Sequence, residues 1–154
     1  MTHELQYYPF TAMGCHMQIL IAGDGDHQAA VSLVVDTFAY AEDVLSRFRP
    51  DSELNQLHRN PDTWHTCSPT LWSVLQAAEW AYTYSNGLID PTIRGALEAY
   101  GYDRTFGDIA ATASATPAAH IPWRAIEWDH DRQRIRLPAG ARIDVAGVAK
   151  SWTA

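Results

Sequence analysis

A long amphipathic stripe between Gly25 and Arg49 is the strongest constraint on the fold of this chain. Polar residues such as Ser32 and Glu42 take the opposite side, and Pro50 ends the pattern because proline cannot continue a helix. The stripe consists of Val31, Val34, Val35, Phe38, Ala41, Leu45 and Phe48, which recur at helical spacing. A helix with one apolar stripe must bury it, so we predict that this helix packs on a sheet.

Further helices are predicted from their start and stop signals, which are N-cap residues followed by proline and terminal glycines. In chain order they are a short helix with Leu54 and Leu57 after Asp51 or Ser52, a helix from Ser68-Pro69 to Asn86-Gly87, a helix over 92–100 between Asp90-Pro91 and Gly101, and a helix that begins at Gly147.

Fewer strands are predicted. Residues 15–21 alternate between apolar and polar, residues 126–137 resemble a hairpin around 129–131, and 142–145 form a strand before the last helix. The Ala-, Thr- and Ser-rich stretch 108–119 is predicted to be a loop. This order predicts an α+β fold in which a mainly antiparallel sheet is covered by helices.

Charge and cysteine content exclude several classes of protein. The chain of 154 residues has 11 basic and 18 acidic side chains and a net charge of −7 without any basic run, so we expect no nucleic-acid partner. Cys15 and Cys67 lie far apart, which indicates a reducing compartment rather than a disulfide-stapled fold. Because no signal pattern precedes Tyr8, we expect a cytoplasmic protein, unless a leader has been removed.

Residues 143–150 combine a strand, a turn of small residues and a helix start that carries Lys150. Backbone N–H groups and the helix dipole at such a turn can hold a phosphate, and the lysine adds a positive charge. Taken alone, the segment favours a simpler interpretation, a tight turn with a solvated lysine, because neither a GxGxxG nor a P-loop spacing is present.

Three more motifs change that balance: Ala12-Met13-Gly14, Ser46-Arg47-Phe48 with Ser52-Glu53-Leu54, and Gly87-Leu88-Ile89-Asp90-Pro91-Thr92. With Asp144 to Lys150 they resemble, in order and spacing, the N-terminal half of the ApbE-type flavin transferases (FAD:protein FMN transferases). The resemblance covers essentially the whole chain. We therefore expect residues 1–154 to be the N-terminal part of one flavin-transferase domain whose second half is absent from this chain, with the flavin in a cleft between the two halves.

The resemblance implies a Mg²⁺-dependent enzyme that splits FAD, releases AMP and attaches FMN through a phosphoester to a Thr or Ser hydroxyl of an acceptor protein. Some members of the family hydrolyse FAD to FMN and AMP instead. Two alternatives therefore stay open beside flavin transfer, FAD hydrolysis and a non-catalytic module that binds flavin or a partner.

The flavin-binding residues that the resemblance implies are Met13, Ser46, Phe48, Glu53, Asp90, Thr92, Asp144, Gly147 and Lys150. Phe48 and Met13 can flank flat rings, although Phe48 is as readily a core residue. Glu53 and Asp90 can accept hydrogen bonds from the ligand, but capping a helix is the simpler role for Asp90. Thr92 can donate to the ligand, and its alternative is a solvated hydroxyl.

For the metal, the resemblance implies the main-chain carbonyl of Ala149, while the other ligands, an Asp and a Thr or Ser, lie in the family's second half. We therefore expect this chain alone to be inactive. We also expect it to be marginally stable or to self-associate, because the apolar surface after Lys150 would be uncovered. Four residues depart from the family pattern, Cys15, His58, Ala146 and Ser151, and of these His58 and Ser151 could alter the polarity of the cleft.

Overall fold

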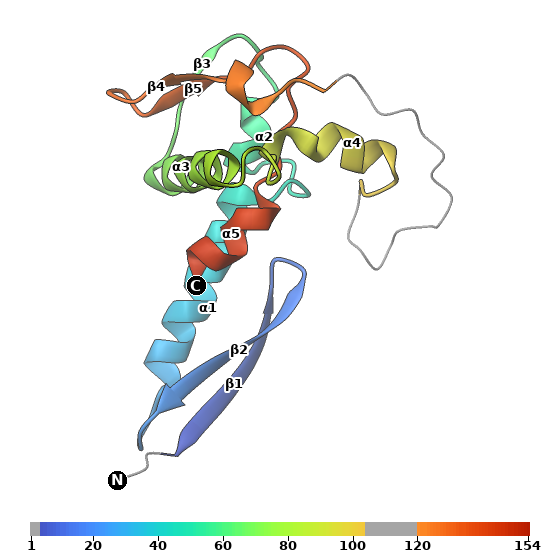
Figure 1. Cartoon of the computed structure of the whole chain (residues 1–154). Coiled ribbons are helices and arrows are strands. Elements are labelled where there is room, and N and C mark those ends of the chain that lie inside the picture. The colour runs from blue at the N-terminus through green and yellow to red at the C-terminus, as the bar shows by residue number, and fades with distance from the viewer. Residues whose placement is uncertain (1–3, 104–119) are drawn as a thin grey trace.

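The computed structural model describes residues 4–103 and 120–154, so the predicted loop 108–119 lies outside the described residues. In chain order the elements are β1 (Leu5–Ala12), β2 (Cys15–Ala22), α1 (Gln28–Leu45), α2 (Glu53–Leu57), β3 (Trp64–Thr66), α3 (Pro69–Tyr84), the 3-10 turn η1 (Pro91–Ile93), α4 (Arg94–Ala99), the 3-10 turn η3 (Trp123–Ala125), β4 (Glu127–Asp129), β5 (Arg134–Arg136) and α5 (Ala146–Thr153). Figure 1 shows the β1–β2 hairpin beside one half of the long helix α1, while α2, α3, α4 and the strands β3, β4 and β5 gather at its other end.

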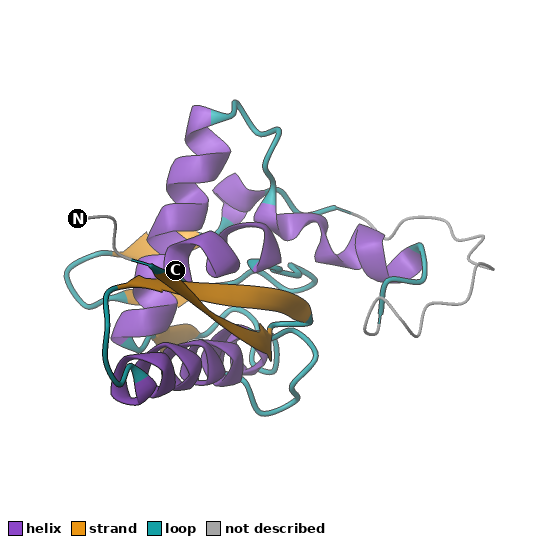
Figure 2. Ribbon diagram, turned by 90° about the horizontal axis from the view of Figure 1, so that it is seen from below, coloured by secondary structure: helices purple, strands orange, loops and turns teal. Residues whose placement is uncertain are grey.

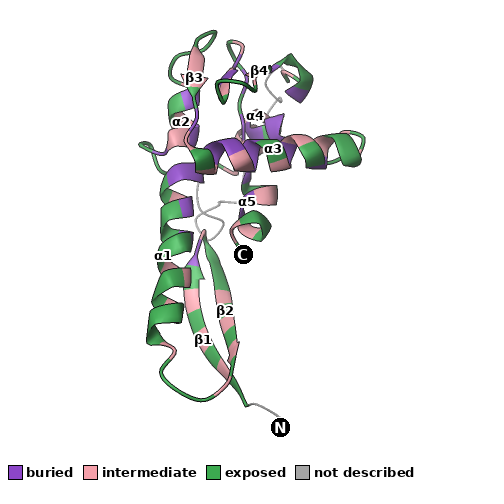
Figure 3. Ribbon diagram, turned by 90° about the vertical axis from the view of Figure 1, so that its left-hand side faces the viewer, coloured by how far each residue is buried: buried purple, intermediate pink, exposed green. Residues whose placement is uncertain are grey.

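The core gathers around α3, where the end of α1, α2, the β4–β5 hairpin and α5 meet (Figure 3). Leu71, Val74 and Leu75 of α3 are completely buried. The other half of α1 and the β1–β2 hairpin are mostly exposed or half-buried. Burial is therefore uneven along α1: of the predicted stripe, Phe38, Ala41 and Leu45 are buried, whereas Val31, Val34 and Val35 are half-buried.

Strands β1 and β2 pair antiparallel over their whole length and lie along the exposed half of α1 (Figure 1). The edge-to-face contact of Phe10 with Phe38, 5.4 Å between ring centroids, joins the hairpin to the helix. Strand β2 confirms the strand predicted over 15–21, whereas β1 was not predicted. Its apolar residues occupy both faces, with Leu5 and Tyr7 on the exposed one, so no alternation was visible.

A second sheet has the order β3-β5-β4, and both of its strand pairs are antiparallel. The predicted hairpin is confirmed as β4 and β5. Strand β3, with three residues, was too short to give a pattern. Helix α3 packs against this sheet, with 5.5 Å between the ring centroids of Trp72 and Trp128. Figure 2 shows α4 leading away to one side. The α+β class with antiparallel pairing is confirmed, although the strands form two separate sheets.

The predicted helix caps are confirmed. Ser52 caps α2, Ser68 caps α3, and Gly101 follows α4 with a φ of 88°. Helix α1, however, ends at Leu45 rather than at Pro50. Phe48 therefore lies outside the helix and is 44% exposed, so the core alternative for this residue is wrong.

The predicted strand over 142–145 is also wrong, because these residues pair with no strand. Their amides have other partners: Ile143 N donates to the imidazole of His58, and Asp144 N donates to the carbonyl of Pro91. The buried side chains Ile143 and Val145 produced the strand-like pattern. None of the helices in the described part of the chain has the length and apolarity needed to cross a membrane.

Candidate functional site

A pocket of about 430 Å³ lies where the β1–β2 turn, the end of α1 and the start of α5 meet. These three parts of the molecule are far apart in the sequence. Six of the ten residues predicted for the site line the pocket: Met13, Ser46, Phe48, Asp144, Ala149 and Lys150. The described structure thus brings most of the predicted site together.

The turn of the β1–β2 hairpin presents Met13 to the pocket. Because Ala12 pairs with Cys15, Met13 and Gly14 form a two-residue turn, and their φ values of 49° and 70° are both positive. Glycine adopts such a conformation easily, whereas methionine does so at a cost. The backbone N–H of Met13 donates to Oε2 of Glu42 at 2.9 Å, so this carboxylate of α1 helps to hold the turn in place.

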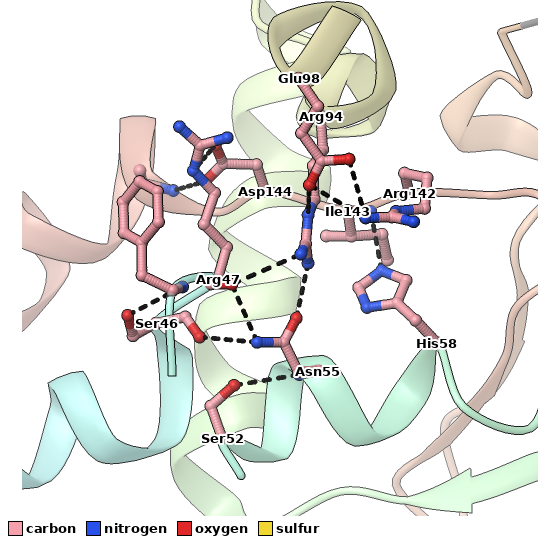
Figure 4. A network of polar contacts seen from close by, with 12 residues as sticks. Ser46, Arg47, Ser52, Asn55, His58, Arg94, Glu98, Arg142, Ile143 and Asp144 are labelled. Carbon is pink, nitrogen blue, oxygen red and sulfur yellow. Dashed lines mark hydrogen bonds and ion pairs between the residues drawn. The ribbon is translucent and has the colours of Figure 1, made fainter. Parts of the chain in front are cut away.

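Asn55 of α2 holds the segment 46–49, which carries Ser46 and Phe48 (Figure 4). Its Nδ2 donates to the carbonyl oxygens of Ser46 at 3.3 Å, Arg47 at 2.9 Å and Arg49 at 2.7 Å. The backbone of this segment makes few other hydrogen bonds: Ser46 N donates to the carbonyl of Glu42 as the last bond of α1, and the carbonyl of Arg49 also accepts from Ser52 N. One amide side chain therefore fixes the backbone on which two predicted site residues stand.

Arg94 of α4 extends this network (Figure 4). Its Nη1 donates to Oδ1 of Asn55 at 2.7 Å, its Nη2 to the carbonyl of Arg47 at 3.4 Å, and its Nε to Glu98 at 2.8 Å. Glu98 also accepts from Arg142. Partial burial alone would raise the pKa of Glu98, but the hydrogen bonds and charges of Arg94 and Arg142 lower it. The carboxylate therefore stays ionised and joins α4 to the segment before α5.

His58 holds that segment from the other side. Its Nε2 accepts the backbone N–H of Ile143 at 2.9 Å, and its Nδ1 is buried without a partner. Burial above all, and then the positive charges of Arg94 and Arg142, lower the pKa of His58 from 6.5 to about 4. The imidazole is therefore neutral near pH 7, with its proton on Nδ1. This departure from the family pattern supports the backbone and does not line the pocket.

Asp144 links the core to the pocket. Its Oδ1 accepts the backbone N–H of Ala146 at 2.8 Å, which satisfies an amide at the start of α5. Its Oδ2 lies 3.3 Å from Nε of Arg47, and the side chains of this ion pair are only 9% and 4% exposed. The carboxylate thus positions the first turn of α5, which carries Ala149 and Lys150 along the pocket wall.

Arg47 is a pocket residue that the sequence analysis did not single out. Its guanidinium carbon lies 4.4 Å from the ring centroid of Phe48 and 4.4 Å from that of Tyr102. The sequence signal was a charged residue directly after the apolar stripe, inside the Ser46-Arg47-Phe48 motif. A buried arginine against the faces of two aromatic rings, which meet edge to face, places positive charge in the wall of the pocket.

The other four predicted residues do not line the pocket. Oε1 of Glu53 accepts the backbone N–H of Ser68 at 2.6 Å. Oδ1 of Asp90 accepts from the backbone N–H and the hydroxyl of Thr92, at 2.8 and 2.5 Å, which is the predicted capping role. Thr92 is buried, so the alternative of a solvated hydroxyl is wrong. Gly147 is exposed in the first turn of α5.

The environment of Ala149 bears on the predicted metal. Its carbonyl oxygen lies within α5, where it belongs to the helical hydrogen-bond ladder, and it also accepts from the hydroxyl of Thr153 at 2.8 Å. Within residues 4–103 and 120–154, no three His, Cys, Asp or Glu side chains are grouped so that they could hold a metal ion. The described residues therefore do not form the group of several oxygen ligands that Mg²⁺ requires.

Comparison with known proteins adds independent findings. The sequence model of the ApbE family matches residues 13–154. A search of curated proteins found no match.

Solved structures of similar fold include the ApbE protein of Thermotoga maritima, with a TM-score of 0.82 and 17% identity, which covers 97% of this chain and 50% of that protein. The flavin transferase ApbE of Vibrio cholerae gives 0.79 and 16%, over 98% and 51%. The apo flavinyl transferase ApbE of Pseudomonas stutzeri gives 0.75 and 15%, over 99% and 53%. The chain thus spans about half the length of these proteins.

The network around Asn55 leads to a first prediction. Replacing Asn55 by Ala removes the partner of three backbone carbonyls and of Arg94, so we expect the free energy of unfolding to fall by about 1–3 kcal/mol. Gln56→Ala is the matched control, because this neighbouring amide is exposed and donates to one carbonyl only. Urea denaturation measures both variants, and equal losses would contradict the role given to Asn55.

A second prediction concerns pH. Unfolded chains take up a proton on His58 near pH 6.5, whereas the folded protein does so only near pH 4. Between these values the unfolded state binds more protons, so stability falls as the pH drops through this window, by at most about 3 kcal/mol. His58→Asn should flatten this dependence, whereas His16→Asn, at an exposed position, should keep it. Urea denaturation at pH 7, 5.5 and 4 tests this, and parallel curves for wild type and His58→Asn would refute it.

Proposed function

Because this chain belongs to the ApbE family, we propose that it forms part of a flavin transferase, an enzyme that moves FMN from FAD to a Thr or Ser hydroxyl of an acceptor protein and releases AMP. One observation carries the proposal. The pocket combines groups suited to a flat ring with a helix start and a lysine suited to a phosphate.

At the ring end of the pocket we place Phe48 and Met13. The phenyl ring of Phe48 is 44% exposed, so its face is available to a ligand. Met13 adds a polarisable thioether to the lining of the pocket, at the hairpin turn. Ser46 also lines the pocket, and its Oγ already accepts the backbone N–H of Phe48 at 3.2 Å.

At the phosphate end we place Lys150 and the first turn of α5. The ammonium group of Lys150 has no ion-pair or hydrogen-bond partner in the described part of the chain, and it borders the pocket. The helix dipole of α5 directs partial positive charge toward the same wall. Gly147, exposed in this turn, leaves room for a close approach to its backbone, since no atom lies within 4 Å of the position that a Cβ would occupy. Asp144 would orient the turn rather than contact the phosphate.

In the proposed reaction these residues bind and orient FAD so that its diphosphate faces the acceptor hydroxyl. Phosphoryl transfer depends on such positioning and on neutralising negative charge. Mg²⁺ belongs to the proposal as the ion that would neutralise the diphosphate, with the carbonyl of Ala149 as one ligand. The described residues do not supply a full ligand set, so the ion would need further ligands besides this carbonyl.

Glu53, Asp90 and Thr92 stay predictions as flavin contacts. In the structure their polar groups are used within the protein, and Thr92 is buried. To bind FAD directly they would have to share or exchange these hydrogen bonds. An acceptor protein, a cytoplasmic location and self-association likewise remain proposals from the sequence.

Replacing Lys150 by Met in the intact protein tests the phosphate end. Loss of one charge-assisted contact of roughly 1.5–3 kcal/mol should weaken FAD binding about ten- to a hundredfold, while riboflavin, which has no phosphate, should bind as before. Arg132→Met, an exposed cation in the β4–β5 turn, is the control and should leave affinity unchanged. Flavin fluorescence titration measures the affinities. Unchanged FAD affinity in Lys150→Met would remove the lysine from the site.

The reaction itself is tested by incubating the intact protein with FAD, Mg²⁺ and a candidate acceptor. We expect AMP to be released while FMN becomes covalently bound to protein, detected by chromatography and by fluorescence of the denatured acceptor. Residues 1–154 tested alone should release none, because the metal ligands that the family uses are not all among them. Equal amounts of AMP and free FMN would instead identify an FAD hydrolase.

A further inference from the structure

Arg47 is buried and yet incompletely bonded. Its side chain is 4% exposed, and both terminal nitrogens, Nη1 and Nη2, are buried without any hydrogen-bond partner. The other buried arginine, Arg94, has all three nitrogens bonded to oxygen atoms. In Figure 4 the free end of the Arg47 guanidinium points away from the network that holds its backbone. Unpaired charged donors in a protein interior are costly, so this arrangement needs an explanation.

The neighbours of Arg47 neutralise its charge but do not accept hydrogen bonds from Nη1 and Nη2. Asp144 lies 3.3 Å from Nε, which leaves the Nη1 and Nη2 edge unused. Phe48 and Tyr102 cover the guanidinium with their rings, each at 4.4 Å, and such contacts offset part of the desolvation cost. Aromatic rings, however, do not accept hydrogen bonds as oxygen or nitrogen atoms do. Nη1 and Nη2 are thus unpaired donors of a residue that lines the pocket.

We propose that Arg47 is a ligand-binding residue of this pocket, whose Nη1 and Nη2 donate to the carbonyl oxygen and nitrogen acceptors on the edge of the flavin ring. The inference rests on the proposed function, because it requires that a flavin enters the pocket. The ring of Phe48 covers the guanidinium of Arg47 and would move when the ligand binds. Phe48 is 44% exposed and follows Arg47 in a segment that is neither helix nor strand. When its ring moves to face the ligand, the donors of Arg47 reach the acceptors.

Charge and shape favour a ring edge over a phosphate as the acceptor. Asp144 already balances the charge of Arg47, so little net attraction remains for a dianion. The rings of Phe48 and Tyr102 meet edge to face at 77°, and both turn toward the guanidinium. The faces of aromatic rings carry negative potential, which opposes a phosphate placed beside them but not a neutral acceptor. The planar fork of a guanidinium matches two acceptor atoms on one rigid group, and Lys150 remains for the phosphate.

The experiment compares riboflavin, FMN and FAD as ligands of the intact protein with Arg47→Met and Arg47→Lys. If Arg47 binds the ring edge, Arg47→Met should weaken all three ligands by the same factor, about ten- to a hundredfold, and Arg47→Lys should fall between it and wild type. Arg134→Met is the matched control, because Arg134 also lies over a ring, Trp64, and pairs with a carboxylate, Asp129, far from the pocket. It should change none of the affinities.

Other outcomes overturn the inference. Unchanged affinities in both Arg47 variants, in proteins that melt as cooperatively as wild type, would leave Arg47 a purely structural partner of Asp144. If the affinities for FMN and FAD fall while that for riboflavin does not, Arg47 contacts the phosphate rather than the ring. If wild type binds no flavin at all, both this inference and the proposed function fail, whereas tight binding that is insensitive to Arg47 overturns the inference alone.

A second readout does not depend on affinity and covers the case in which Arg47→Met fails to fold. Reduced flavin carries negative charge at the pyrimidine edge of its ring, and a guanidinium that donates there stabilises the reduced form. Arg47→Lys, which keeps the charge but not the planar fork, should therefore shift the reduction potential of bound flavin to a more negative value. A potential equal to that of wild type and of Arg134→Met would count against contact with the ring.

Discussion

The side chain of Asn55 is the contact on which the pocket depends, because it binds the backbone of a segment that has no regular structure of its own. Where α1 ends, the chain turns out of the helix and its carbonyl groups lose their helical partners. The side-chain amide of Asn55 donates hydrogen bonds to three of these carbonyls. Arg94 then joins Asn55 across 39 positions of sequence, and Glu98 joins Arg142 across 44. A loop, a helix and an extended segment are thereby fixed relative to one another, and the pocket forms beside them.

Much of the helical structure could be predicted because its signals are local. The Ser68-Pro69 start and the Asn86-Gly87 end lie within a few residues of the hydrogen bonds that they control. Strands gave weaker signals. β1 has apolar residues on both faces, because its hairpin packs on a single helix and neither face enters the core. Residues 142–145 had the pattern of a strand because Ile143 and Val145 are buried, but periodicity cannot tell which partner the backbone bonds.

The site was predictable as a set of motifs but not as a geometry. Met13, Phe48 and Lys150 come together as their order and spacing implied. The same motifs gave no means of separating Asp144, which lines the pocket, from Thr92, which is buried beside Asp90. Arg47 lies inside one of the motifs but was not predicted as a site residue, because its burial depends on contacts with Asp144 and Tyr102, which are distant in the sequence. Such long-range packing has no signature in a short window of sequence.

The uneven burial along α1 divides the molecule into parts of different local stability. Opening the β1–β2 hairpin exposes Phe38, but the hairpin residues that face α1, such as Phe10, are only half-buried. It therefore costs less free energy than unfolding the core around α3. Met13, at the tip of this hairpin, is also a wall of the pocket. A ligand that touches Met13 binds only the closed hairpin and must stabilise it by linkage. Affinity then depends on how much of the time the hairpin is closed, and residues remote from the pocket, such as Phe10 against Phe38, acquire influence over binding without contacting the ligand.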